Sequence, residues 1–178
     1  MTEFMLRMMH AALLDAATYE AIEADRSATP QAFAVVVLAS VAAGLGSLEN
    51  NGWSGIGYIT VAALVGWLAW VWLACFIGTR ILPRPKTSAD LGELLRTIGF
   101  ASSPGILLVL ALFPPISPYV YPVCGLWMLI AMVVAVRQAL DYEGPGGTAR
   151  AIAVCAIGFP LYVLLLVTAL LALGPWPI

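Results

Sequence analysis

The residues best suited to chemistry in this 178-residue chain are few and scattered. A single histidine, His10, could ligate a metal ion or a pigment, but a lone histidine on an amphipathic segment is ordinary. Three cysteines, Cys75, Cys124 and Cys155, lie within apolar runs and form no CxxC pair, so we interpret them as small buried hydrophobic residues. The sequence therefore predicts no metal site and no cofactor.

Motifs of known enzymes give no stronger signal. The chain contains neither a zinc-binding HExxH pattern nor a GxSxG nucleophile turn. The glycines from Gly144 to Gly147 are not accompanied by the lysine and hydroxyl residue of a phosphate-binding loop, so we interpret this stretch as a flexible turn before a helix. We predict no catalytic residues, and an enzyme is the class of function with the least support.

The elements that hold these residues are strongly apolar. Hydrophobic residues make up 62% of the chain and charged residues only 10%, against about 25% charged in soluble domains. Five runs are long enough to cross a bilayer, at about residues 31–48, 56–78, 97–113, 119–136 and 151–173. None of them contains Asp, Glu, Lys, Arg or His. The sequence predicts an all-α integral membrane bundle of five transmembrane helices, and residues 31–178 form this domain.

The eight basic residues alternate with the predicted spans. They precede the first span or lie between the second and third or the fourth and fifth: Arg7, Arg26, Arg80, Arg84, Lys86, Arg96, Arg137 and Arg150. Because Lys and Arg are retained on the cytoplasmic side, this pattern predicts a cytoplasmic N-terminus and a C-terminus outside. Acidic residues share most of the same segments, so no clustered basic patch exists and nucleic-acid binding is not expected.

Residues 1–30 are predicted to be an amphipathic cytoplasmic or interfacial segment. Apolar side chains recur at helical spacing from Met1 to Asp25, with charged residues between them. A helix lying in the headgroup region accounts for this pattern, with its methionines and leucines in lipid. A methionine-rich helix that docks on a partner, or a disordered segment, remains an alternative.

Small residues and prolines are expected to shape the bundle. Ser40 and Gly44 are four residues apart, as are Ala42 and Gly46, a spacing that lets helices approach closely in lipid. A short turn is predicted at residues 49–55, and a capping box is predicted from Thr87 to Asp90.

Two prolines should bend their helices, Pro104 in the third span and Pro160 in the fifth. At the first of these bends, Ser102 and Ser103 can supply partners for the freed backbone.

Two further groups of residues leave alternatives open. Trp67 and Trp70 share a helix face and could pack on a partner or pigment, although packing within their own helix or against lipid is the simpler interpretation. The basic residues of the inner rim could contact lipid headgroups or a partner, or could snorkel and form internal ion pairs. These candidate rim residues are Arg80, Arg84, Lys86, Arg96, Arg137 and Arg150.

From about residue 88 onward the chain resembles the Yip family of five-span membrane proteins, which are named for interaction with Ypt/Rab GTPases, in its short bacterial form. The stretch Leu94–Pro104 is similar to the third-span signature of the family, a glycine and an aromatic residue followed by proline. Gly125-Leu126-Trp127 with 135–140, and 147–151, resemble the fourth span with its exit and the start of the fifth. The resemblance implies an adaptor or organiser rather than an enzyme. The positions that it matches are expected to serve packing and bending rather than to form a site: Gly99, Phe100, Pro104, Trp127, Arg137 and Arg150. The candidate packing and bend positions are Gly99, Phe100, Pro104, Trp127 and Pro160.

The function expected from these observations is that of a bacterial inner-membrane scaffold or accessory protein, which organises or stabilises a larger membrane complex through helix packing. Its expected partners are membrane lipids and either other membrane-protein subunits or further copies of itself. The alternative is an oligomeric channel or transporter for a neutral or lipidic substrate.

Overall fold

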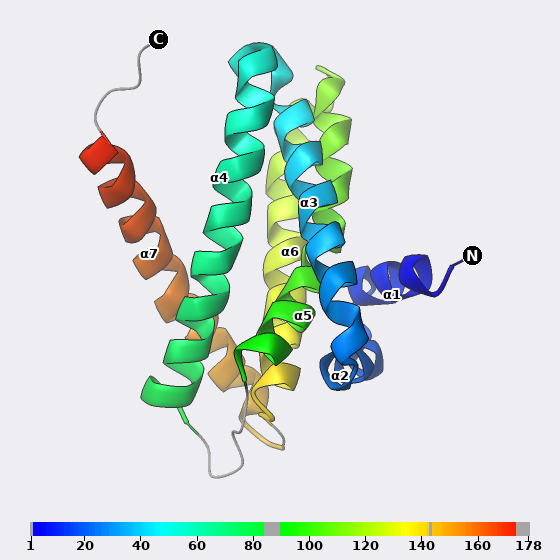
Figure 1. Ribbon diagram of the computed structural model, residues 1–178, viewed down its shortest axis with the longest axis vertical. Coiled ribbons are helices and arrows are strands. Elements are labelled where there is room, and N and C mark those ends of the chain that lie inside the picture. The colour runs from blue at the N-terminus through cyan, green and yellow to red at the C-terminus, as the bar shows by residue number, and fades with distance from the viewer. Residues whose placement is uncertain (1, 84–89, 143, 174–178) are drawn as a thin grey trace.

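The computed structural model describes residues 2–83, 90–142 and 144–173, and within these ranges the chain is helical, with no β-strand. Figure 1 shows the elements. In chain order they are α1 (Glu3–Ala12), α2 (Ala16–Ala24), η1 (Arg26–Ala28), α3 (Thr29–Gly46), α4 (Leu48–Phe76), η2 (Ile77–Ile81), α5 (Leu91–Ala101), η3 (Ser103–Leu112), α6 (Ser117–Ala139) and α7 (Gly147–Leu173).

Five helical stretches are long and apolar enough to cross a membrane: 26–46, 56–81, 91–112, 117–139 and 147–165. This finding confirms the all-α, five-span fold. The third stretch begins six residues before the predicted span, at Leu91, and therefore contains the charged residues Glu93 and Arg96.

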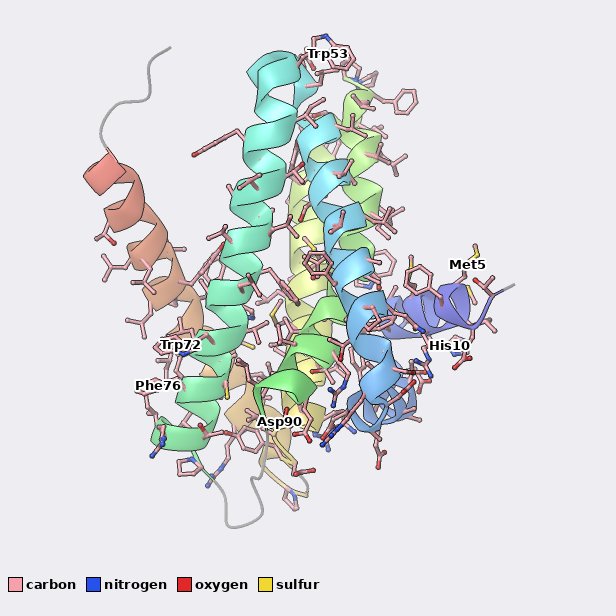
Figure 2. The ribbon with its side chains drawn as sticks, in the orientation of Figure 1. Met5, His10, Trp53, Trp72, Phe76 and Asp90 are labelled. Atoms are coloured by element: carbon pink, nitrogen blue, oxygen red, sulfur yellow. The ribbon has the colours of Figure 1, made fainter. Side chains whose placement is uncertain are left out.

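The bundle has two unlike ends. We call one the charged end: it comprises α2, η2, the start of α5 and the turn that joins α6 to α7, and it lies at the bottom of Figure 1. Asp90 marks this end, and Trp53 lies at the opposite end (Figure 2). The two N-terminal helices flank the lower half of the bundle, and α1 lies across the direction of the spans (Figure 1).

Burial is uneven among the spans. The most apolar window of the α5–η3 stretch is 67% buried, whereas those of α6 and α7 are 28% and 22% buried. The α5–η3 stretch is therefore central, with α3, α6 and the N-terminal helices packed on it. At its far end α7 diverges from the other helices (Figure 1), which leaves much of its apolar surface outside the protein core.

Small residues allow α3 to approach its neighbours closely, as the sequence predicted. A Cβ added at Gly44 would lie 3.2 Å from the Ile56 Cα atom, and one added at Gly46 would overlap the carbonyl oxygen of Leu108 in η3. Beside them, the Thr60 hydroxyl donates to the Ser40 carbonyl at 3.4 Å. The predicted close contacts of α3 with α4 and with η3 are therefore present.

The α-helix is interrupted beside Pro104, where the sequence predicts a bend. The α-helix ends at Ala101, and the chain continues as the 3-10 helix η3 from Ser103. Proline lacks the N–H that would bond to the carbonyl four residues earlier. That carbonyl, on Phe100, instead accepts a hydrogen bond from the Ser103 hydroxyl at 2.6 Å, and Ser102 donates to the Ile98 carbonyl at 3.3 Å.

The N-terminal segment differs from the single helix predicted over Met1–Asp25. It folds into two helices, because Leu14 has a φ of 65° that no helix continues through. The Asp15 carboxylate caps the second helix by accepting from the Ala17 N–H at 3.2 Å and from the Thr18 hydroxyl at 2.6 Å. The chain can therefore turn back, so that the buried Tyr19 hydroxyl donates to the Ala11 carbonyl at 3.0 Å.

Two other local predictions need correction. The turn expected at residues 49–55 is largely helical: α4 begins at Leu48 and is kinked at Gly52, whose φ of 62° suits glycine. The capping box at the start of α5 is formed by Asp90 and Glu93 rather than by Thr87 and Asp90. Thr87 lies outside the described residues.

The packing of α3 predicts opposite effects for two glycine substitutions. Gly46→Ala should lower the free energy of unfolding by about 1–3 kcal/mol, because the Leu108 backbone must move to admit the methyl group. Gly125→Ala, on the exposed side of α6 where an added Cβ meets nothing within 4 Å, should be neutral or stabilise by up to about 1 kcal/mol. Reversible unfolding in detergent micelles measures both. Equal losses at the two positions would contradict the packing of α3 on η3.

Candidate functional site

A polar cleft of about 580 Å³ opens at the charged end of the bundle. Its walls come from three places that are far apart in the sequence: α2, the first turn of α5, and the end of α6 with the turn that follows it. The lining residues are Glu20, Glu23, Ala24, Glu93, Arg137, Gln138, Asp141, Tyr142 and Gly144. The cleft therefore gathers four carboxylates, one guanidinium and one amide.

The α5 side of the cleft is fixed by the capping box. Asp90 accepts from the Glu93 backbone N–H at 2.8 Å, and the Glu93 carboxylate accepts from the Asp90 N–H at 2.9 Å. These reciprocal bonds satisfy two backbone donors that a helix start otherwise leaves unpaired. They also hold the Glu93 side chain at the start of the helix.

The α6 side of the cleft is fixed by a turn anchored on Tyr142. Asp141 has a φ of 51°, which reverses the chain after α6. The Tyr142 side chain is buried, and its hydroxyl donates to the carbonyls of Gly78 at 3.2 Å and Leu82 at 2.8 Å. Arg137 donates through Nε to the Tyr142 carbonyl at 3.4 Å. The turn is therefore tied to η2 and to Leu82, which directly follows η2, as well as to α6.

The α2 wall is held by a buried arginine of α5. Arg96 is 6% exposed, and its Nε donates to the carbonyls of Ile22 at 3.2 Å and Glu23 at 3.1 Å, while Nη2 also donates to Glu23. These carbonyls lie in the last turn of α2, where backbone acceptors are unsatisfied and the helix dipole is negative. A buried cation thus caps the end of an N-terminal helix. The ion pairs found among the described residues involve Arg7 instead.

The first N-terminal helix is held in the same way. The indole Nε1 of Trp127 in α6 donates to the Ala12 carbonyl, the last of α1, at 2.7 Å. The ring of Phe4 packs edge-on against Phe100 of α5, with 6.4 Å between ring centroids. Ala11, Tyr19 and Ile22 are buried in the same cluster as the core residues of α5 and α6. The N-terminal segment is therefore part of the folded core.

Glu23 has the most altered acid–base behaviour of the cleft. The pKa of its carboxyl is raised from the usual 4.5 to about 7, chiefly by burial and also by the negative charges of Asp141 and Glu93, against the opposing effect of Arg96. The cleft can therefore bind and release a proton near neutral pH. In the part of the chain that the structure describes, no three His, Cys, Asp or Glu side chains are placed so that they could hold a metal ion together, the cleft carboxylates included.

The structure separates the candidate rim residues into different environments. Arg80 is exposed on η2, Arg137 lines the cleft, and Arg150 donates to the Pro83 carbonyl at 3.3 Å. Arg96 is turned inward toward α2. Arg84 and Lys86 lie outside the described residues.

The candidate packing positions cluster around α5. Gly99 faces Ala32 of α3, where an added Cβ would come within 2.8 Å of the Ala32 Cβ. Phe100 and Pro104 are buried beside the bend, and Trp127 reaches α1. Pro160 is exposed on α7.

Trp67 and Trp70 pack on other spans of the chain. Trp67 meets Phe33 of α3 edge-on at 6.4 Å, and Trp70 meets Tyr162 of α7 at 6.0 Å. The Trp70 ring of α4 also packs over Gly158 of α7, and this contact of an aromatic ring with a glycine brings the two helices together. Neither indole N–H has a hydrogen-bond partner in the structure. His10 is exposed on α1, away from the cleft lining.

Sequence patterns could not have found the cleft. Arg96 and its acceptors are 73–74 residues apart, and no local periodicity pairs them. The one available signal is that Arg96 directly precedes an apolar span, a position where a charge needs a partner. No family model matches the chain, and neither curated proteins nor solved structures show a significant match to it.

Removing the Arg96 guanidinium should loosen α2. Arg96→Leu is expected to lower the free energy of unfolding by about 2–4 kcal/mol, because charge-assisted hydrogen bonds are lost and buried carbonyls are left unpaired. Hydrogen–deuterium exchange of residues 16–24 should rise well beyond the change elsewhere. Arg80→Leu, at an exposed arginine of the same end, is the control and should leave exchange in α2 unchanged. Unchanged protection of α2 in Arg96→Leu would contradict the capping role.

The raised pKa of Glu23 predicts that stability falls as pH rises. Between about pH 4.5 and 7 the folded chain holds a proton that the unfolded chain releases, so the stabilising contribution is complete below this range and is lost as pH passes through 7. Thermal unfolding of the wild type should show a loss of about 1–2 kcal/mol across this window, allowing for solvent screening. Glu23→Gln should reduce that dependence, and Glu20→Gln, which removes only the weakest of the charge effects on Glu23, should retain most of it. A profile that Glu23→Gln leaves unaltered would contradict this assignment.

Proposed function

We propose that this chain is a scaffold or accessory subunit of the bacterial inner membrane, which organises or stabilises a larger membrane complex through helix packing. In this proposal the charged end faces the cytoplasm and the C-terminus lies in the periplasm. The distribution of basic residues supports the orientation, because the six that lie in described segments belong to α1, η1, η2, the start of α5, the end of α6 and the start of α7.

The observation that carries the proposal is the uncovered surface of the outer spans, where exposed glycines lie among large apolar side chains. Gly57 on α4 and Gly125 on α6 are exposed, and a Cβ at either position would meet nothing within 4 Å. Around them the exposed faces carry large apolar side chains such as Val61, Leu126 and Leu129. A glycine among large residues leaves a notch in which the backbone of another transmembrane helix can approach closely. Such notches favour a protein neighbour on these faces.

The chemistry of the bundle supports a packing role over a solute path. Three polar side chains of the spans are engaged within the chain: Arg96 with α2, Ser103 with Phe100 and Thr60 with Ser40. A path for ions generally needs ionisable groups that face a water-filled space. The resemblance of the second half of the chain to the Yip family agrees with an organising role.

Co-purification in mild detergent or native nanodiscs, followed by native mass measurement, tests the proposal. The tagged full-length chain is expected to retain another membrane protein at a fixed stoichiometry. Gly57→Phe or Gly125→Phe should abolish that association while the chain remains folded, because the ring fills the notch. Leu126→Phe, on the same exposed surface of α6, enlarges a side chain without filling a notch and should retain the partner.

Two results would overturn the proposal. One is a chain recovered alone or only as a self-oligomer from the native membrane, which would instead favour the channel or transporter interpretation. The other is a partner whose retention none of the notch substitutions affects.

A further inference from the structure

Helix α1 has three distinct faces around its circumference. One face packs on the protein and comprises Phe4, Met8 and Ala11. A second is apolar and uncovered: Met5, Leu6, Met9 and Leu13 are 52%, 37%, 44% and 67% exposed. A third is polar and comprises Glu3, Arg7 and His10. At about 100° per residue these sets occupy separate sectors of the helix. In water, a helix that packs on the protein needs one apolar face for that contact and one polar face for the solvent. The second apolar face of α1, which the protein leaves uncovered, therefore requires a separate explanation.

The polar face is directed toward the charged end. The Arg7 guanidinium pairs with the Asp25 carboxylate at 2.8 Å and donates to Gln31 at 3.4 Å, and both partners lie at the start of the first span. Met5 and His10 project from opposite sides of α1, with His10 on the side of the charged end (Figure 2). The apolar sector therefore faces toward the middle of the spans.

The contacts of α1 hold it beside membrane-spanning segments rather than beyond them. Phe100 and Trp127, which bind α1 through a ring contact and a hydrogen bond, lie within apolar spans. The helix lies crosswise against this part of the bundle (Figure 1). Its uncovered methionines and leucines thus continue the apolar surface that the spans present to lipid.

Helix α2 provides an internal comparison. It lies closer to the charged end than α1 (Figure 1), and its exposed residues are small or acidic: Ala16, Ala17, Glu20, Ala21 and Ala24. No large apolar side chain of α2 is exposed. Helices α1 and α2 are adjacent and joined by a three-residue turn, but their exposed surfaces differ in polarity. The exposed surface of α1 suits hydrocarbon, and that of α2 suits water.

We infer that α1 lies in the plane of the bilayer at its charged-end boundary, with Met5, Met9 and Leu13 in contact with lipid acyl chains and His10 at the headgroups. The hydrocarbon boundary passes between α1 and α2. An amphipathic helix at such a boundary typically sinks its apolar face about 5–10 Å below the headgroups. This inference concerns the lipid contact of the chain and stands independently of the proposed function.

Spin-label accessibility in vesicles tests the inference. A cysteine-free chain (C75A, C124A, C155A) carries single nitroxides at Met9, Leu13, His10 or Ala21 and is reconstituted into phosphatidylethanolamine–phosphatidylglycerol vesicles. Labels at Met9 and Leu13 should collide more with oxygen, which concentrates in hydrocarbon, than with a water-soluble nickel chelate. Labels at His10 and Ala21 should show the reverse preference. Met9 and His10 are neighbours in sequence, so this pair is a matched control for position along the chain.

Two outcomes would overturn the inference. Preference for the nickel chelate at all four positions would place α1 in water. Protection of Met9 and Leu13 from both reagents would instead show that protein, such as a second copy, covers the apolar sector.

A second measurement uses the unaltered chain. Wild-type protein is photolabelled by lipids that carry a diazirine in the acyl chain, and trypsin then cuts after Arg7 and Arg26. Label confined to Met9 and Leu13, and absent from residues 16–24 of the same peptide, supports the inference. Label distributed equally over both helices contradicts it.

Discussion

Hydrocarbon cannot hydrogen-bond, so a charge or a freed backbone carbonyl drawn into this bundle is costly unless it finds a partner within the chain, and this constraint accounts for much of the structure. Arg96 is the clearest case: it is an arginine on a membrane-spanning stretch, 6% exposed, whose bonds go to the last carbonyls of α2. The same demand is met at Phe100, whose carbonyl loses its helical donor to Pro104 and gains the hydroxyl of Ser103. Among the described residues, the buried indole N–H groups of Trp67 and Trp70 are the exceptions. Apart from Glu49 at the start of α4, the charged side chains of the described residues lie in the N-terminal segment or toward the charged end.

This constraint also gives the N-terminal helices their place. A short helix exposes unpaired carbonyls at its C-terminal end, and α1 and α2 each present theirs to a donor from the bundle, Trp127 for α1 and Arg96 for α2. Each bond therefore satisfies a helix end and a buried donor at once. Helix α2 is thereby held against α5 and α6 and closes one wall of the cleft, where Glu23 sits among other carboxylates. Helix α2 therefore both attaches the N-terminal segment to the bundle and carries Glu23, the group that titrates in the cleft.

Features that depend on local chemistry could be predicted from the sequence. The five spans follow from long uncharged runs, and the bend with its serine partners follows from Pro104 beside Ser102 and Ser103. The close packing of α3 follows from the four-residue spacing of Ser40 with Gly44 and of Ala42 with Gly46. In each case the residues that decide the structure are neighbours in the chain.

Features that depend on distant partners could not be predicted. The break at Leu14 interrupts an apolar periodicity that continues on both sides, and it is compensated by Tyr19 and by packing against α5 and α6. The cleft needs α2, α5 and the turn after α6 to meet, and the pKa of Glu23 depends on that meeting. Nothing in the sequence distinguishes Asp141 and Glu93 from other surface acids. Only the fold places them close enough to Glu23 to raise its pKa.

The charged end of this five-span bundle should lie on one side of the membrane and the Trp53 end on the other. Single cysteines at Ala24, Gly144 and Trp53 in the cysteine-free chain, treated with a membrane-impermeant maleimide in intact and permeabilised spheroplasts, test it most directly. We predict that the cysteines at Ala24 and Gly144 react only after permeabilisation, whereas the cysteine at Trp53 reacts in intact spheroplasts. Labelling of Gly144 and Trp53 from the same side would contradict it.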